Sequence, residues 1–266
     1  MEKFKKILAD FGIPRIIILL FLLSLFIIAP FVKVSIGASL SDVANRFGMN
    51  ALMVLAMVPM IQTGCGLNFG LSLGVLGGLL GSTLAMQFGL VGIAGFFTAV
   101  FLTIIFSGII GLGYSQILNK VKGEEMTIAM YIGFASVTFM AILWIVLPYS
   151  NPSMVWAYSG QGLRTTITLD GYWVNILNDF LPIKIGSFKF PTGVILFCAV
   201  CMFLMKLFMK TRTGTALTAV GSNPDFARAS GVSINRARTI SIVLSTICGG
   251  IGILLYQQSF GFIQLY

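Results

Sequence analysis

The chain alternates between long apolar runs and short polar breaks, and Gly, Pro, Asn and Ser mark most of the breaks. A membrane core of ~30 Å takes about 20 apolar residues in helical form. From Phe47 to Asn119 no residue is charged, and a helical stretch of that length must cross such a core several times. The pattern therefore predicts an all-α, polytopic transmembrane helix bundle with about seven spans. The predicted spans are residues 16–32, 49–62, 71–86, 90–112, 126–147, 192–209 and 239–256.

Polar segments join these spans, and we treat residues 1–266 as one transmembrane domain. Residues 38–48 offer a helix start at Ser41 and predict a short interfacial helix that connects the first two spans. Residues 149–189 are rich in Ser, Thr, Asn, Asp, Gly and Pro and predict a small extracytoplasmic cap. Residues 210–238 predict a basic cytoplasmic loop.

The charges give the bundle an orientation. The 266 residues include 17 Lys and Arg against 8 Asp and Glu, a formal net charge of +9, and only 9% of them are charged. Soluble domains carry about 25% charged residues, so a soluble globular fold is excluded. With the N-terminus in the cytoplasm, most Lys and Arg residues fall in the inner segments, as the positive-inside rule requires. The topology thus explains the positive charge without a nucleic-acid partner.

The residue types exclude several chemistries. The chain has no histidine, which excludes His-dependent metal sites and Ser-His-Asp or Cys-His catalysis. Cys198 and Cys201 form a CxxC, but they lie inside an apolar run where residues i and i+3 are helical neighbours. We therefore interpret them as core residues and expect no metal site.

Glycine recurs at every fourth position from residue 66 to residue 78. On a helix this spacing gives a stripe without side chains, where another backbone can approach closely. The stripe predicts helix packing, and a smooth wall in a solute path is the alternative. Its members are Gly66, Gly70, Gly74 and Gly78.

Uncharged polar residues cluster where the second span breaks, near residues 63–68. Such groups at membrane depth face protein or a water-filled cavity. They are candidates for the translocation path of a neutral polar solute, and the equally strong alternative is that they only satisfy the broken helix. The candidate path residues are Gln62, Thr63, Asn68 and Ser72.

The basic loop contains a short predicted helix over residues 224–230. Asn223 can cap it, Pro224 suits its first position, Asp225 complements its dipole, and Gly231 suits its end. Its exposed face would present an aromatic and an arginine side chain, Phe226 and Arg228, a combination common at protein interfaces. The alternative is a surface helix that only links two spans.

These residues resemble the coupling segment of bacterial ABC importer permeases for sugars, nucleosides and branched-chain amino acids. In that family T-R-x-G, a small apolar run and G-x-N-x-x-A-A-x-x-x-G-I/V join two spans. The segment 66–74, GLNFGLSLG, is also similar to the Gly-Ile-Asp-Leu-Ser-Val-Gly motif of sugar permeases, with Asn68 in place of the acid and two residues added. Residues 122–130 are similar to the acidic turn of nucleoside-type permeases. The loop positions that match are Thr211, Arg212, Gly214, Gly221, Asn223, Ala227, Ala229, Gly231 and Val232.

The resemblance implies a bacterial inner-membrane subunit, embedded in membrane lipid, that works with other proteins. Its implied partners are a second permease copy or paralogue, cytoplasmic ABC ATPases and an extracytoplasmic solute-binding protein. The permease is then not an enzyme and binds no cofactor, since ATP and Mg²⁺ belong to the ATPase. In agreement, the sequence has no Gly-x-x-x-x-Gly-Lys-Ser/Thr motif. The implied ATPase-coupling residues are Gly221, Asn223, Pro224, Asp225, Phe226, Ala227, Arg228 and Gly231.

The family has further helices after the span that ends near Tyr256, so the resemblance also implies that C-terminal helices are missing from this chain. The favoured function is ATP-driven transport of a small polar solute, a simple sugar or a nucleoside. A branched-chain amino acid permease of the same group is one alternative. A gradient-driven carrier or channel is another, and the lack of charge at the middle of the predicted spans argues against it. A membrane scaffold or receptor with the cap as its ligand surface is the third.

Overall fold

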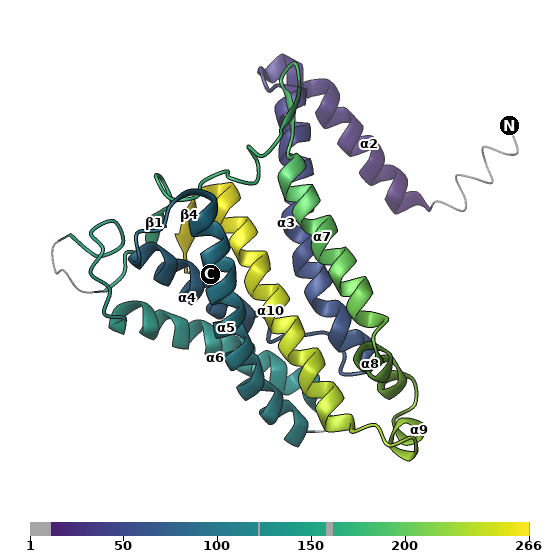
Figure 1. Ribbon diagram of the computed structural model, residues 1–266. Coiled ribbons are helices and arrows are strands. Elements are labelled where there is room, and N and C mark those ends of the chain that lie inside the picture. The colour runs from purple at the N-terminus through teal and green to yellow at the C-terminus, as the bar shows by residue number, and fades with distance from the viewer. Residues whose placement is uncertain (1–11, 122, 158–161, 266) are drawn as a thin grey trace, which may run out of the picture.

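The computed structural model describes residues 12–121, 123–157 and 162–265, and within them the chain is an all-α helix bundle (Figure 1). The basic residues Lys3, Lys5, Lys6 and Lys122, which contribute to the predicted orientation, lie outside the described residues. Six helical segments there are long and apolar enough to cross a membrane, and a seventh apolar helix, α4, is shorter. The helices are α2 (Ile13–Ile28) with the 3₁₀ turn η1 (Ala29–Val32), α3 (Ile36–Gln62), α4 (Leu71–Gln87), α5 (Gly92–Lys120), α6 (Glu125–Val146), α7 (Thr192–Met209), α8 (Arg212–Ser222), α9 (Pro224–Ala229) and α10 (Ile234–Phe260).

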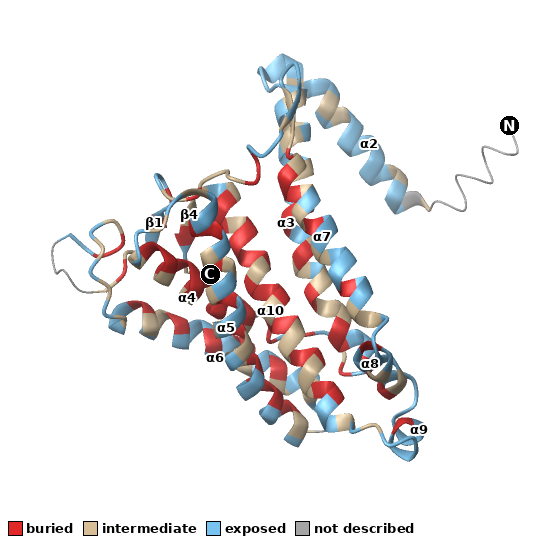
Figure 2. Cartoon of the chain, in the orientation of Figure 1, coloured by how far each residue is buried: buried red, intermediate tan, exposed pale blue. Residues whose placement is uncertain are grey.

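The helix α10 forms the centre of the bundle. Helices α3, α4 and α5 pack around it, and Figure 2 shows buried residues along α4 and α10. The helix ends at Phe260 because Gly261 adopts a left-handed φ of 77° and donates its N–H to Gln257 O at 2.8 Å. In contrast, α2 lies apart from the bundle in Figure 1 and exposes its apolar side chains.

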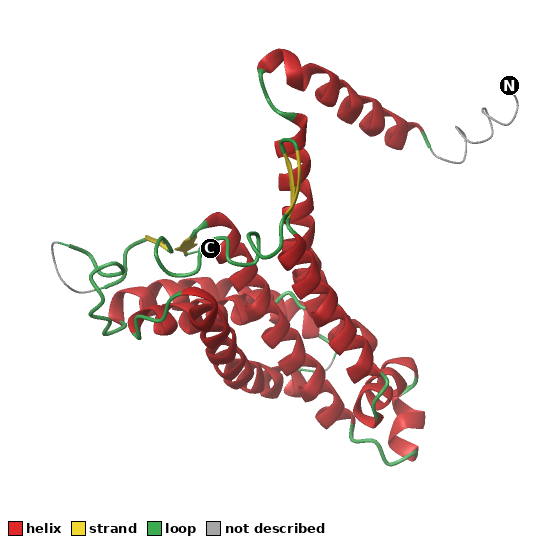
Figure 3. Ribbon diagram, turned by 45° about the horizontal axis from the view of Figure 1, so that its top comes forward, coloured by secondary structure: helices red, strands yellow, loops and turns green. Residues whose placement is uncertain are grey.

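Among the described residues, four short strands lie at one end of the bundle, which we call the strand end (Figure 3). The opposite end carries α8 and α9, and we call it the loop-helix end. At the strand end, β1 pairs with β4, so the chain after α10 is tied to the section that was predicted as a cap. The strands are β1 (Thr166–Thr168), β2 (Ile183–Ile185), β3 (Phe188–Phe190) and β4 (Phe262–Gln264), in the antiparallel pairs β1–β4 and β2–β3.

Residues 149–157 and 162–189 pack closely on the ends of the helices. Trp144 of α6 donates its Nε1–H to Arg164 O at 2.7 Å, and Asn151 donates its Nδ2–H to Met86 O at 2.9 Å. Trp173 is completely buried. These contacts close the strand end of the bundle with side chains that the sequence pattern only marks as polar or aromatic.

The predicted interfacial helix over residues 38–48 is wrong. Residues 36–62 form one continuous helix, because nothing between Ser41 and Met49 breaks the helical backbone. Gly48 allows this helix to lie directly against α7, since a Cβ at Gly48 would lie 2.6 Å from Val194 Cγ1. The polar residues Asp42 and Arg46 therefore sit on the exposed surface of α3 near the strand end.

The predicted four-glycine stripe is only partly correct. Gly66 and Gly70 precede α4 and do not share a helical face with Gly74 and Gly78, because Gly66 has a φ of 80°. Within α4, Gly74 and Gly78 lie against α10, whereas a Cβ at Gly77 would lie 2.7 Å from the backbone of Ser107 in α5. The glycines of α4 thus allow two helices to approach it from different sides.

Candidate functional site

The second membrane helix ends in a non-helical segment, residues 63–70, which we call the polar break. The N–H groups of Gly64 and Cys65 donate to Ile61 O and Met60 O, both at 3.1 Å. This is the Schellman arrangement, and it depends on the left-handed φ of 75° at Gly64. The backbone is thereby turned out of α3 and directed between α10 and the helices beyond it.

Asn68 joins the polar break to two helices. It is 2% exposed and donates its Nδ2–H to Ser245 Oγ of α10 at 2.8 Å. Tyr114 of α5 donates its hydroxyl to Asn68 Oδ1 at 3.2 Å. Because Ser245 lies near the middle of α10, this uncharged network lies at the middle depth of the bundle. We call the three side chains the Asn68 network.

The other predicted path residues are placed differently. Ser72 donates to Gly133 O at 3.2 Å and accepts a hydrogen bond from Ser136 Oγ of α6 at 2.7 Å. Thr63 is buried and donates to Pro59 O of its own helix. Gln62 is exposed at the end of α3 and lies outside the network. The structure therefore brings Asn68 and Ser72 into contact with neighbouring helices, and Gln62 does not join them.

Sequence reasoning missed Tyr114, Ser136 and Ser245 as members of this polar region. Each is a polar residue inside an otherwise apolar run. A polar residue within an apolar run needs a hydrogen-bonding partner at membrane depth. The sequence does not reveal which partner it has, because Asn68 and Ser245 are far apart in the sequence.

The loop between α7 and α10 contains two helices, of which the sequence predicted only α9. Asn223 caps α9 by accepting the N–H of Phe226 at 2.9 Å, and Pro224 occupies the first turn. Gly231, with a φ of 82°, follows the helix end. The helix α8 begins where Thr211 Oγ1 accepts the N–H of Gly214 at 3.2 Å.

The two faces of α9 differ in exposure. Ala227 is buried in a cluster with Leu217 and Val220 of α8 and Ala237 of α10. Phe226 is 66% exposed. The charged residues Asp225 and Arg228 are also exposed, and Arg228 Nη1 lies 3.6 Å from Asp225 Oδ1. The helix is thus anchored by a small apolar side chain and presents an aromatic one outward.

The loop helices contact the polar break directly. A Cβ built on Gly64 would lie 3.2 Å from Gly221 Cα, and a Cβ built on Gly221 would lie 3.0 Å from Gly64 N. A cavity of about 220 Å³ lies beside this contact, and Thr63, Pro224 and Arg238 are among the residues that line it. The two regions that the sequence marked separately therefore meet at the loop-helix end.

A mostly buried ion pair lies next to this cavity. Arg238 of α10 contacts Glu125 of α6 at 2.6 Å, with side chains that are 10% and 18% exposed. Arg238 also donates to Leu118 O of α5 at 3.5 Å. The pair holds α10, α5 and α6 together at the loop-helix end, and sequence reasoning treated Arg238 only as a loop charge.

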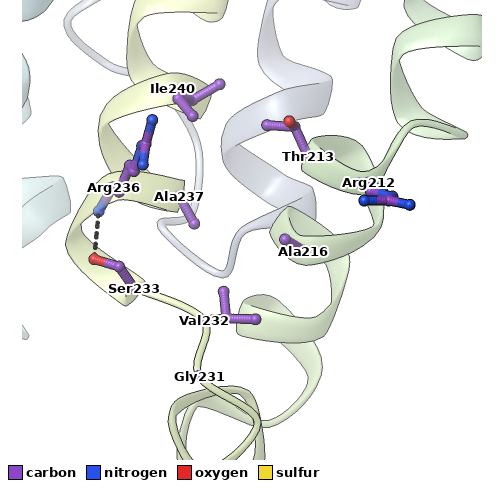
Figure 4. Close-up of a pocket in the computed structure, with 9 residues that line it drawn as sticks. All are labelled: Arg212, Thr213, Ala216, Gly231, Val232, Ser233, Arg236, Ala237 and Ile240. Carbon is purple, nitrogen blue, oxygen red and sulfur yellow. Dashed lines mark hydrogen bonds between the residues drawn. The ribbon is translucent and has the colours of Figure 1, made fainter.

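A second cavity, of about 360 Å³, separates α8 from the start of α10. Figure 4 shows Ala216, Val232 and Ala237 around the space between the helices, with Arg212 and Arg236 on its opposite sides.

Comparison with known proteins gives one family. Residues 39–266 match the family model described as the permease component of the branched-chain amino acid transport system. The nucleoside ABC transporter permease protein NupC of Lactococcus lactis subsp. cremoris (strain MG1363) is 26% identical over 160 residues, which are 59% of this chain and 48% of that protein. The match thus spans about half the length of this curated relative, and no solved structure matches the chain. The chain belongs to the family of ABC importer permeases and is a multi-pass integral membrane protein of the bacterial inner membrane.

Proposed function

We propose that this chain forms the translocation path of an ABC importer for a small neutral solute, a simple sugar or a nucleoside. The observation that carries this proposal is the direct contact between Gly221 of the loop helices and Gly64 of the polar break. It links a surface suited to an ATPase with polar groups at membrane depth.

In the proposed mechanism the loop-helix end faces the cytoplasm and α9 sits in a groove of an ABC ATPase. Phe226 and Arg228 supply its contact surface, because both are exposed and combine aromatic and cationic character. ATP and Mg²⁺ are bound and used by the ATPase, and this chain hydrolyses nothing. Closure of the ATPase moves α8 and α9 together, since Ala227, Leu217 and Val220 pack as one cluster.

The movement of α8 acts on the polar break through Gly221. Because Gly221 lies against the backbone of residues 62–64, a shift of α8 displaces the end of α3 and the segment that carries Asn68. The Asn68 network then exchanges its internal hydrogen bonds for bonds to the solute. Rearrangement between two packed states of this kind is a common form of switching.

The chemistry of the Asn68 network favours a neutral solute. An amide, a phenol and a hydroxyl both donate and accept hydrogen bonds, as the hydroxyl groups of sugars and nucleosides do. A branched-chain amino acid carries an ammonium and a carboxylate group, and this network contains no charged side chain to pair with either. The name of the nucleoside permease of Lactococcus lactis supports the same choice.

The proposal includes three further partners. A second permease copy or paralogue completes the membrane unit, a solute-binding protein docks at the strand end, and membrane lipid surrounds the exposed apolar helices. The strand end suits docking because its strands and loops are tied to α6, α4 and α10 by hydrogen bonds.

Uptake in the native cells tests the proposed function. Cells that lack the chain are complemented with the wild type or with Phe226→Ala, and uptake of labelled D-ribose, uridine and L-leucine is measured. We expect ATP-dependent uptake of ribose or uridine by the wild type only. Uptake by the purified chain alone in liposomes, driven by a gradient, would instead identify a secondary carrier.

A further inference from the structure

A polar pocket of about 140 Å³ lies at the strand end, far from the loop helices. It is formed by the first turns of α3, by the loop between β1 and β2, and by the segment that leads from β3 into α7. Its polar lining residues are Ser41, Asp42, Asn45, Asn175, Asn178 and Lys189.

The wall of this pocket is fixed by a hydrogen-bond network. Asn178 is 9% exposed, donates its Nδ2–H to Asn175 Oδ1 at 2.9 Å, and accepts Gln258 Nε2–H at 3.2 Å. Gln258 of α10 is completely buried and accepts the N–H of Leu177 at 3.2 Å. Ser259 donates to Asn45 Oδ1 at 3.3 Å. The side chains are therefore held in place before a ligand arrives, which lowers the cost of binding.

The pocket retains free hydrogen-bonding groups. Because Asn45 uses its Oδ1 for Ser259, its Nδ2 remains a donor without a partner among the described residues. Among the residues that the structure describes, the carboxylate of Asp42 also has no hydrogen-bond or ion-pair partner. The ammonium group of Lys189 forms an ion pair with Asp179. The backbone N–H of Lys189 donates to Ser41 Oγ at 2.7 Å.

These groups define the ligand chemistry. The pocket offers amide donors and a carboxylate acceptor, whereas its cation is already paired, so an anionic group would meet Asp42 without compensation. A hydroxyl group both donates and accepts and can satisfy Asp42 and Asn45 together. The pocket is small, about 140 Å³, which suits one sugar ring better than a whole nucleoside.

We infer that this pocket binds the hydroxyl groups of a neutral polyhydroxyl solute, such as a pentose ring, where the solute enters the permease. The inference rests on the proposed function for its role in transport, and its binding chemistry stands on the pocket alone. It assigns a recognition role to Asp42 and Asn45 of α3, which lie at the end of the bundle opposite the polar break.

Equilibrium binding to the purified chain in lipid nanodiscs tests the pocket. D-Ribose is titrated and observed by ligand-detected NMR, with L-leucine as the comparison compound. We expect saturable ribose binding and none for leucine. Asp42→Asn and Asn45→Leu should each weaken ribose binding at least fivefold, and Ser39→Ala, a half-buried change on the same helix outside the pocket lining, should leave it within twofold. Asp42 is exposed, so Asp42→Asn is expected to fold normally.

The outcomes separate the pocket from the proposed function. The assignment of this pocket as a ribose site is overturned if ribose binding is not saturable, or if the wild type, Asp42→Asn and Asn45→Leu bind ribose equally. This holds even if an ATPase copurifies with the chain. Ribose binding that is weakened by these two variants supports the pocket even if no ATPase is found, and in that case the importer proposal fails by itself.

Discussion

Gly221 of α8 lies so close to Gly64 of the polar break that neither position has room for a Cβ without displacing the other backbone. Two segments separated by most of the chain are thereby in van der Waals contact at the loop-helix end. In the proposed mechanism, a push on α8 would be transmitted to the end of α3 through backbone atoms, which cannot rotate away as a side chain can. In that mechanism, this contact is the mechanical link between an ATPase and the solute path.

The Gly221–Gly64 contact predicts that Gly221→Ala uncouples transport. The added methyl group would overlap Gln62 O and separate α8 from the polar break. We expect solute uptake to fall at least tenfold while the chain still inserts in the membrane. Gly113→Ala is the matched control, because a Cβ there meets no atom within 4 Å. Normal uptake by Gly221→Ala would remove this link from the mechanism.

The exposed side chain of Phe226 predicts a loss of partner binding without a loss of stability. Phe226→Ala removes a ring that is 66% exposed, so the thermal unfolding midpoint of the purified chain should change little. Removing an aromatic anchor from an interface costs about 2 kcal/mol or more of binding, so copurification of the ATPase should fall at least tenfold. Phe134→Ala, at an exposed position of the membrane helix α6, should bind the ATPase like the wild type.

The Asn68 network predicts a graded effect on stability and uptake. Tyr114→Phe removes one hydrogen bond, for which about 0.6 kcal/mol is typical inside membrane proteins. Asn68→Ala leaves both Tyr114 and Ser245 without their partner and should cost about 1–3 kcal/mol. SDS-induced unfolding measures the stability, and uptake kinetics should show a raised KM for both variants. Equal stability of the two variants would contradict the proposal that Asn68 stabilises the chain through hydrogen bonds to both Tyr114 and Ser245.

The buried ion pair predicts strong coupling between Glu125 and Arg238. Glu125→Gln leaves the guanidinium of Arg238 uncompensated, and because both side chains are mostly buried we expect a loss of about 3 kcal/mol of unfolding free energy. The double variant Glu125→Gln with Arg238→Met should recover most of that loss, since it removes both charges. A double-mutant cycle in which the two changes are simply additive would show that the pair does not interact.

Much of the helical fold follows from the sequence. The apolar run 192–209 becomes α7 with the same bounds, and the capping pattern Asn223-Pro224 predicts α9 to within one residue. Both succeed because the signal is local: an uninterrupted apolar run in one case, a side chain that caps its own helix in the other.

The errors come from tertiary context. Residues 38–48 look like a separate interfacial helix because they are polar, but polarity does not end a helix, and α3 continues through them. The glycine spacing suggested one helical stripe, although Gly64 and Gly66 adopt left-handed φ values that end α3 and prevent it. The pairs Gly221–Gly64 and Asn68–Ser245 join distant segments, so no local pattern in the sequence predicts them.

Copurification tests the central claim most directly. The tagged chain is isolated in mild detergent from its native cells, beside the Phe226→Ala variant, and the proteins bound to each are identified by mass spectrometry. The account predicts that an ATPase with a Walker motif copurifies with the wild type, together with a second permease or a solute-binding protein, and is lost from Phe226→Ala. A folded wild-type chain that purifies without any ATPase, or an ATPase bound equally by both chains, would contradict it.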